Sequence, residues 1–84
     1  MRVTFSNHAK NKFKVFERHG FKITETNVLE TVENPTDKSR GRKGRLIMQR
    51  PFDKSHVLRV ICEAEGDDIK VITFYPARKE RYEN

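Results

Sequence analysis

The chain has 84 residues, enough for one domain with a single thin core, so we expect one domain over residues 1–84. Charged residues make up 36% of the sequence and the net charge is +6, which favours a polyanionic partner, with nucleic acid ahead of an acidic protein or an anionic membrane. The single cysteine excludes an internal disulfide, and the lack of a signal-peptide core or of roughly 20 consecutive apolar residues predicts a cytoplasmic protein without membrane contact.

The first half of the chain predicts a short strand followed by two helices. Residues 3–5 alternate between apolar and polar side chains, as a strand does. Ser6 or Asn7 can cap the first helix, because their side-chain oxygens accept hydrogen bonds from the first turn. Thr24 is a similar cap for a second helix, which Pro35 cannot continue. The apolar positions of the two helices are Ala9, Phe13, Phe16, Val28, Leu29 and Val32.

The second half of the chain changes to a period of two and predicts three strands. Residues 36–45 form a basic loop, and the strands are expected in 45–50, 56–65 and 69–75, with turn-forming residues between them. The order is therefore β-α-α-β-β-β, an α+β fold in which two helices pack on one face of a small antiparallel sheet.

The last hairpin can be given a register from its tight turn. Pairing Ala64 with Ile69 brings Glu63 opposite Lys70, a favourable pair of charges. Continued without a break, this register assigns one face to Leu46, Met48, Leu58, Val60, Cys62, Val71, Thr73 and Tyr75. It assigns the other face to Ile47, Gln49, Arg59, Ile61, Ile72 and Phe74.

The first of these faces is the more aliphatic and is the expected seat of the helices. The second carries a cation beside an aromatic ring, in the form of Arg59 next to Phe74, and such a surface can bind a phosphate and stack a base. The alternative is a central strand covered on both sides, with Arg59 reaching a carboxylate at the rim. The pattern leaves both interpretations open.

His8 is expected in the first turn of the first helix, at the margin of its apolar face. Lys12, Val15 and His19 fall on the same flank of the helical wheel. A partly shielded histidine can exchange a proton near neutral pH and so act as a general base. Spacing alone favours the plainer interpretation, a rim histidine that is hydrogen-bonded to the sheet or to solvent.

Several side chains could support RNA cleavage without a metal ion. That reaction needs a group to deprotonate the 2′-hydroxyl, a cation to hold the charged phosphorane and a group to protonate the leaving oxygen. The residues with this chemistry are His8, Arg59, Tyr75 and Arg78. RNA contacts are expected from Lys12, Lys38, Arg40, Arg42, Lys43, Arg45, Lys79 and Tyr82. The three scattered histidines and one cysteine give no zinc spacing, so neither a metal nor another cofactor is expected.

Four segments of the chain resemble the small RelE/ParE-type toxins, and most of all their histidine-bearing relatives. The segments are the histidine of the first helix, "FERHG…IT", "PT…RKGRL" and "VLRVICEAEGDDIKVITFYPARKERY". The resemblance implies a RelE-like fold and the toxin of a toxin–antitoxin pair. Such a toxin is a metal-independent endoribonuclease that cuts RNA, often message on the ribosome, and is inhibited by a cognate antitoxin protein.

The resemblance also implies roles for individual residues. His8 matches the histidine of the first helix, Arg59 the arginine in mid-sheet, Thr73 or Tyr75 the polar position of the last strand, and Arg78 or Tyr82 the C-terminal cation or tyrosine. The register above conflicts with this, because it places Arg59 and Thr73 on opposite faces. Two other functions fit the same fold: a non-catalytic module that binds nucleic acid or protein, and a toxin that poisons gyrase by binding it.

Overall fold

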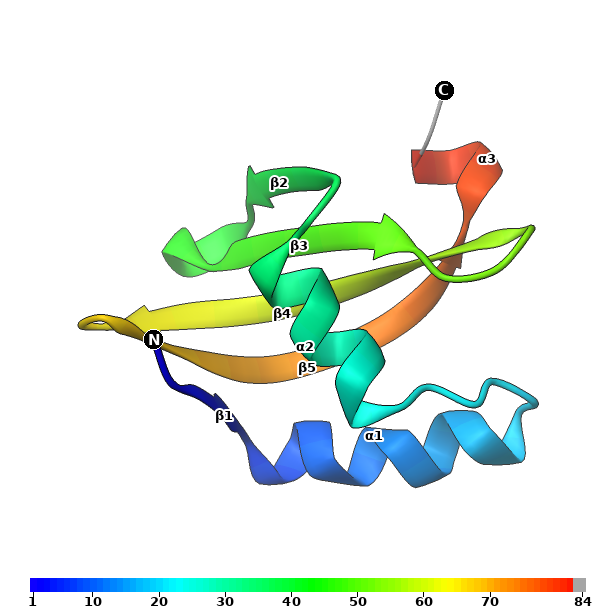
Figure 1. Ribbon diagram of the computed structural model, residues 1–84, viewed down its shortest axis with the longest axis horizontal. Helices are drawn as coiled ribbons and strands as arrows, with labels where there is room; N and C mark the ends of the chain where they lie inside the picture. Colours follow the sequence, from blue (N-terminus) through cyan, green and yellow to red (C-terminus); the bar gives the residue numbers. More distant parts are fainter. Residues whose placement is uncertain (83–84) are drawn as a thin grey trace.

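Five strands and three α-helices form the described part of the chain, residues 1–82, in the computed structural model (Figure 1). Side chains are described for residues 1–81. The elements are β1 (Val3–Phe5), α1 (Asn7–Arg18), α2 (Glu25–Glu33), β2 (Asp37–Arg40), the 3₁₀ turn η1 (Arg42–Gly44), β3 (Leu46–Pro51), β4 (His56–Glu65), β5 (Asp68–Arg78) and α3 (Lys79–Tyr82). The expected α+β class is confirmed.

The strands form one sheet in the order β1-β5-β4-β3-β2. The expected antiparallel meander is confirmed for β3, β4 and β5, but β1 runs parallel to β5. The sheet is therefore mixed, and the expectation of a purely antiparallel sheet is wrong. The expected loop 36–45 also contains β2, which pairs with β3 at the opposite edge from β1. A helix, α3, follows β5 in the tail, where no element is expected from the sequence.

Helix α1 is fixed at its start by Ser6 and along its length by aromatic packing. The Ser6 side chain accepts a hydrogen bond from the amide of Ala9 at 3.0 Å, which confirms Ser6 as the N-cap. Ala9 is fully buried, and the rings of Phe13 and Phe16 lie 4.7 Å and 6.1 Å from the ring of Phe74. These contacts join the expected apolar face of the helix to β5.

Helix α2 begins at the expected cap, Thr24. Its side chain accepts from the amide of Asn27 while the Asn27 side chain accepts from the amide of Thr24, a reciprocal capping box. Val28 and Val32 are buried against β3 and β4. Both long helices therefore cover the same face of the sheet, as expected.

A β-bulge in β5 changes which of its side chains enter the core. The register follows the expected one as far as Cys62 opposite Val71, and then slips so that Ile61 pairs with Thr73 rather than Ile72. A bulge places two residues of one strand opposite a single residue of its partner, so the side chains after it point to the opposite faces from those expected. Phe74 therefore points into the core, where it is fully buried, and the expected facing of Thr73, Phe74 and Tyr75 is wrong.

Cys62 lies in the core between the helices and the sheet. Burial raises the pKa of its thiol to about 12, so the sulfur stays protonated near neutral pH. A buried thiol of this kind is unreactive.

Candidate functional site

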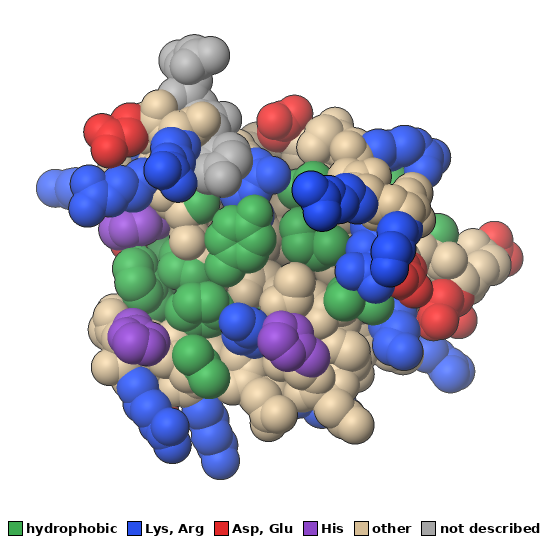
Figure 2. Space-filling view, turned by 180° about the vertical axis from the view of Figure 1, so that it is seen from behind, with side chains coloured by type: hydrophobic (Ala, Val, Ile, Leu, Met, Phe, Trp, Pro, Cys, Tyr) green, Lys and Arg blue, Asp and Glu red, His purple; other side chains and the backbone are tan. Residues whose placement is uncertain are grey.

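The sheet face turned away from α1 and α2 carries a compact group of polar and apolar side chains. We call it the open face, and it is formed by Ile47, Gln49, Arg59, Ile61, Thr73 and Tyr75, which pair directly across neighbouring strands. Figure 2 shows this side, opposite to the side on which α2 lies in Figure 1: hydrophobic side chains occupy its middle and basic side chains surround them. The bulge removes the conflict noted above, because Arg59, Thr73 and Tyr75 now share one face.

Arg59 lies at the centre of the open face, where Tyr75 and Gln49 are two of its hydrogen-bond partners. Its Nε donates to the hydroxyl of Tyr75 at 3.0 Å, and its Nη1 donates to the side-chain oxygen of Gln49. Gln49 is buried, and the guanidinium carbon of Arg59 lies 6.0 Å from the centre of the Tyr75 ring. These contacts orient the guanidinium on the open face. The expected cation beside an aromatic ring is present, with Tyr75 in the place expected for Phe74.

One end of the open face is a cationic hollow at η1. It has a volume of about 360 Å³ and is lined by Gly41, Arg42, Lys43, Arg45, Ile47 and Ile61. Arg45 pairs with Glu63 at 3.0 Å, whereas Arg42 and Lys43 are exposed. Lys43 has a φ of 59°, an uncommon backbone conformation for a residue with a side chain. The hollow therefore presents positive charge beside half-buried isoleucines.

Lys38 and Arg40 do not belong to this hollow. They pair with Met48 and Leu46, whose side chains point toward the helices, so they lie on the opposite side of the sheet. The expected continuous run of RNA-binding cations over 38–45 is therefore divided between the two faces of the sheet.

The other end of the open face lies where β5 meets α3. A cavity of about 540 Å³ is lined there by Tyr75, Pro76, Ala77, Arg78, Glu80 and Arg81. Arg78 pairs with Glu80 at 3.6 Å, and both side chains are largely exposed. Tyr75 and Arg78 thus line one cavity, although the alternation along β5 directs them to opposite faces of the sheet. The side chain of Tyr82, an expected RNA contact, lies outside the described residues.

His8 is exposed on α1, rather than partly shielded as expected. Among the described residues it makes no hydrogen bond or ion pair, and it lines none of the cavities named here. Lys12, on the same flank, places its Nζ 5.3 Å from the centre of the Phe16 ring. Histidine side chains are visible along the lower edge of the open face in Figure 2, the edge along which α1 runs in Figure 1. The structure therefore brings Arg59 and Tyr75 together but does not bring His8 into contact with them.

His56 and Asp53 form a pair that the reasoning from sequence missed. His56 Nδ1 lies 2.9 Å from an oxygen of Asp53, and its ring meets the ring of Phe21 edge-on at 4.9 Å. Slight burial opposes ionisation of Asp53, but hydrogen bonds from Ser55 and His56 and the charge of His56 outweigh it, so the pKa of Asp53 is lowered. The turn "PFDKSH", with a carboxylate three residues before a histidine, was the available signal.

We expect the Asp53→Asn variant to lose stability in a pH-dependent way. A carboxyl with a lowered folded-state pKa stabilises the fold above its unfolded pKa of about 3.8, and that contribution is lost as the pH falls through the folded value. Because the pair is partly exposed, the expected loss at pH 6 is a few tenths of a kcal/mol, up to about 1 kcal/mol. Urea unfolding at pH 6 and near pH 2.5 measures it, and the difference from the wild type should vanish at the lower pH. Asp67→Asn, in the exposed β4–β5 turn, is the matched control; an equal loss there would contradict the assignment.

Comparison with protein-family models, with curated proteins and with solved structures gave no match. Within the described range, no three His, Cys, Asp or Glu side chains gather as a metal site requires. No helix among the same residues is long and apolar enough to cross a membrane.

Proposed function

We propose that this chain is the toxin of a toxin–antitoxin pair and cleaves RNA on its open face without a metal ion, on a RelE-like fold. The observation that carries the cleavage proposal is the guanidinium of Arg59, which is held by Tyr75 and Gln49 between two cationic ends of one sheet face. Isoleucines and a tyrosine ring offer surfaces for bases, and the surrounding cations offer contacts for phosphates. The toxin class, the ribosome and an antitoxin partner rest on the sequence resemblance.

The proposed reaction uses the RNA's own 2′-hydroxyl as nucleophile. A general base, His8 in the first instance, takes the hydroxyl proton, and the 2′-oxygen forms a bond to phosphorus. The bond from phosphorus to the 5′-oxygen breaks, and the leaving oxygen receives a proton from Tyr75. Arg59 holds the negative charge that builds on the phosphoryl oxygens, a task for which its planar fork is suited. The products are a 2′,3′-cyclic phosphate and a 5′-hydroxyl end.

Incubation of the purified chain with RNA and excess EDTA tests this function. We expect cleavage that primer extension maps to defined positions, on naked RNA or on ribosomes, and that His8→Ala reduces. RNA left intact under both conditions would refute the enzymatic proposal. Induced expression of the chain alone should arrest growth if it is a toxin, and co-expression of a short reading frame that adjoins its gene should relieve the arrest if that frame encodes the antitoxin.

A second candidate is a module that binds single-stranded RNA on the same face without cutting it. It is favoured by the position of His8, which is exposed and has no described contact with Arg59 or Tyr75. In that case RNA binding is salt-sensitive, and the His8→Ala variant binds as the wild type does. Cleavage in the EDTA experiment decides between the two candidates.

Either candidate predicts that RNA affinity depends on the cations of the η1 hollow. We expect the double variant Arg42→Gln/Lys43→Gln to bind RNA less tightly. The slope of log Kd against log salt should fall by about 0.7 for each phosphate contact that is lost. The matched control is Lys38→Gln/Arg40→Gln, which removes the same charge from the other side of the sheet. Equal slopes for the two double variants would contradict binding on the open face.

A further inference from the structure

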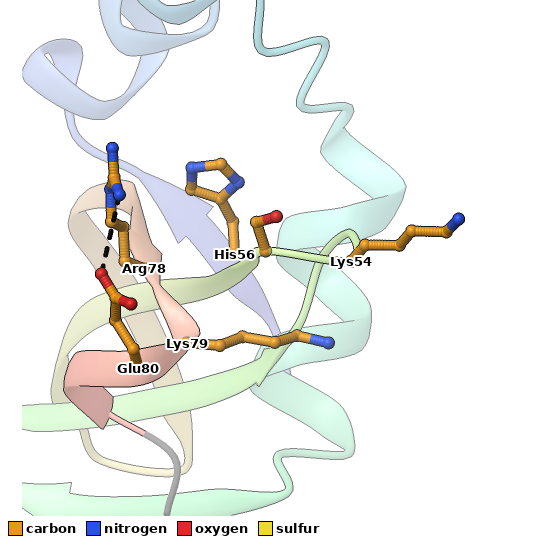
Figure 3. Close-up of a pocket in the computed structure, with 6 residues that line it drawn as sticks. Lys54, His56, Arg78, Lys79 and Glu80 are labelled. Atoms are coloured by element: carbon orange, nitrogen blue, oxygen red, sulfur yellow. Dashed lines mark ion pairs between the residues drawn. The ribbon is translucent and has the colours of Figure 1, made fainter.

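A second charged pocket lies at the end of the sheet, between the β3–β4 turn and the start of α3. We call it the end pocket; it has a volume of about 420 Å³ and is lined by Lys54, Ser55, His56, Arg78, Lys79 and Glu80. Figure 3 shows His56 and Arg78 extending to the same side, with Arg78 meeting Glu80, while Lys54 and Lys79 extend in a common direction. Arg78 is the one member of this lining that is also a catalytic candidate from the sequence, and the proposed cleavage reaction gives no step to any of the six.

The backbone that frames the end pocket is fixed by hydrogen bonds. The amide of Phe52 donates to the carbonyl of His56 at 2.9 Å, and the amide of Ser55 donates to Asp53 at 2.8 Å. The amide of Lys79 donates to the carbonyl of Ser55 at 2.9 Å, which ties α3 to the turn. The His56 ring is held between Asp53 and the ring of Phe21. The lining side chains therefore project from a hydrogen-bonded backbone frame.

The lining groups are suited to an anion of more than one charge. Three permanent cations, Lys54, Arg78 and Lys79, stand against a single lining carboxylate, Glu80, so the pocket is net positive. Ser55 adds a hydroxyl, and His56 adds an imidazole whose Nδ1 faces Asp53. Charge-assisted hydrogen bonds from lysine and arginine are the usual contacts for phosphate oxygens.

We propose that the end pocket binds the terminal phosphate of an oligonucleotide, a phosphomonoester. A monoester carries close to two charges near neutral pH, and the backbone phosphodiester carries one, so the two lysines, which extend in a common direction (Figure 3), favour the monoester. The link to nucleic acid is the position of the pocket: Arg78 and Glu80 also line the cavity that reaches Tyr75 on the open face. The position of the rest of the strand on the open face rests on the proposed function, but binding of the phosphate does not.

Titration of the full chain with inorganic phosphate tests the pocket itself. We expect the imidazole NMR signals of His56 to shift with phosphate and not with an equal ionic strength of chloride. The Lys54→Gln/Lys79→Gln variant should bind phosphate at least tenfold more weakly, since it loses two charge-assisted contacts. Lys10→Gln/Lys14→Gln on α1 removes the same charge from exposed positions and should bind as the wild type does. No shift of His56, or equal weakening in both double variants, would overturn the proposal.

Binding of short 2′-deoxy oligonucleotides tests the identity of the ligand without cleavage, because they lack the attacking hydroxyl. We expect the wild type to prefer a strand with a 5′- or 3′-terminal phosphate over the same strand with hydroxyl ends. Lys54→Gln/Lys79→Gln should abolish that preference, whereas Arg59→Ala should weaken phosphorylated and unphosphorylated strands alike. A wild type that binds all strands equally would overturn the proposal. Failure of RNA cleavage is a separate result, since the preference is measured on strands that cannot be cleaved.

Discussion

Replacement of Phe74 by alanine is expected to lower the free energy of unfolding by about 3–5 kcal/mol, the usual cost of emptying a buried aromatic site. Phe74 is fully buried and its ring packs against those of Phe13 and Phe16, so its loss leaves a cavity between α1 and β5. For a domain of this size, which has a small total stability, that loss brings the fold close to unfolding. Urea denaturation followed by circular dichroism measures it.

The comparison with Tyr75→Ala turns this measurement into a test of the β-bulge. Tyr75 is half-buried on the open face, so its truncation should cost much less stability than that of Phe74. Without the bulge the regular alternation would put Tyr75 in the core and Phe74 on the open face. A larger loss in Tyr75→Ala than in Phe74→Ala would therefore contradict the facing of β5 described here.

Replacement of Arg59 by alanine is expected to lower RNA cleavage by about 10²–10³-fold in kcat, as removal of one group that stabilises charge in a transition state usually does. Arg59→Lys keeps the charge but loses the planar fork that reaches both Tyr75 and Gln49, so it should restore only part of the rate. Single-turnover cleavage of a defined RNA, with thermal unfolding of each variant, separates the loss of activity from a loss of folding.

Arg50→Ala is the matched control for Arg59→Ala. Arg50 pairs with Leu58 and so lies on the helix-covered side of the sheet, where its guanidinium donates to the carbonyl of Asn34 at 2.7 Å. Its loss removes the same charge and one hydrogen bond but leaves the open face intact. Similar cleavage rates for the two alanine variants would remove Arg59 from the proposed site.

Local signals in the sequence are sufficient to predict most of the helices and strands of the fold. The cap at Thr24 is confirmed, and of the two candidates for the first helix, Ser6 and Asn7, the structure shows Ser6, since a polar cap followed by regularly spaced apolar residues is contained within a few positions. The register at Glu63 and Lys70 was also correct, because the tight turn fixes it. Strand β2 was not recognised, since its four exposed residues, 37–40, carry no apolar alternation and are held by pairing with β3.

The candidate site was harder to predict because it depends on one irregularity in β5. The sequence leaves two environments open for Arg59, and in one of them it lies beside the ring of Phe74; the structure places it beside the ring of Tyr75 instead. Nothing local marks Ile72 as a bulged residue; Phe13 and Phe16 come from α1, far away in the sequence, and provide the site that Phe74 fills. Tertiary packing therefore decides to which face of the sheet the side chains after the bulge point.

The bulge is also bonded directly to the N-terminus of α1. The hydroxyl of Ser6 donates to the carbonyl of Ile72 at 2.7 Å while the same oxygen caps the helix, and the amide of Ser6 donates to the carbonyl of Val71 at 2.9 Å. One serine thus joins the helix that carries His8 to the irregularity that orients Tyr75. A displacement of the start of α1 must therefore break these hydrogen bonds or move the bulge together with the helix.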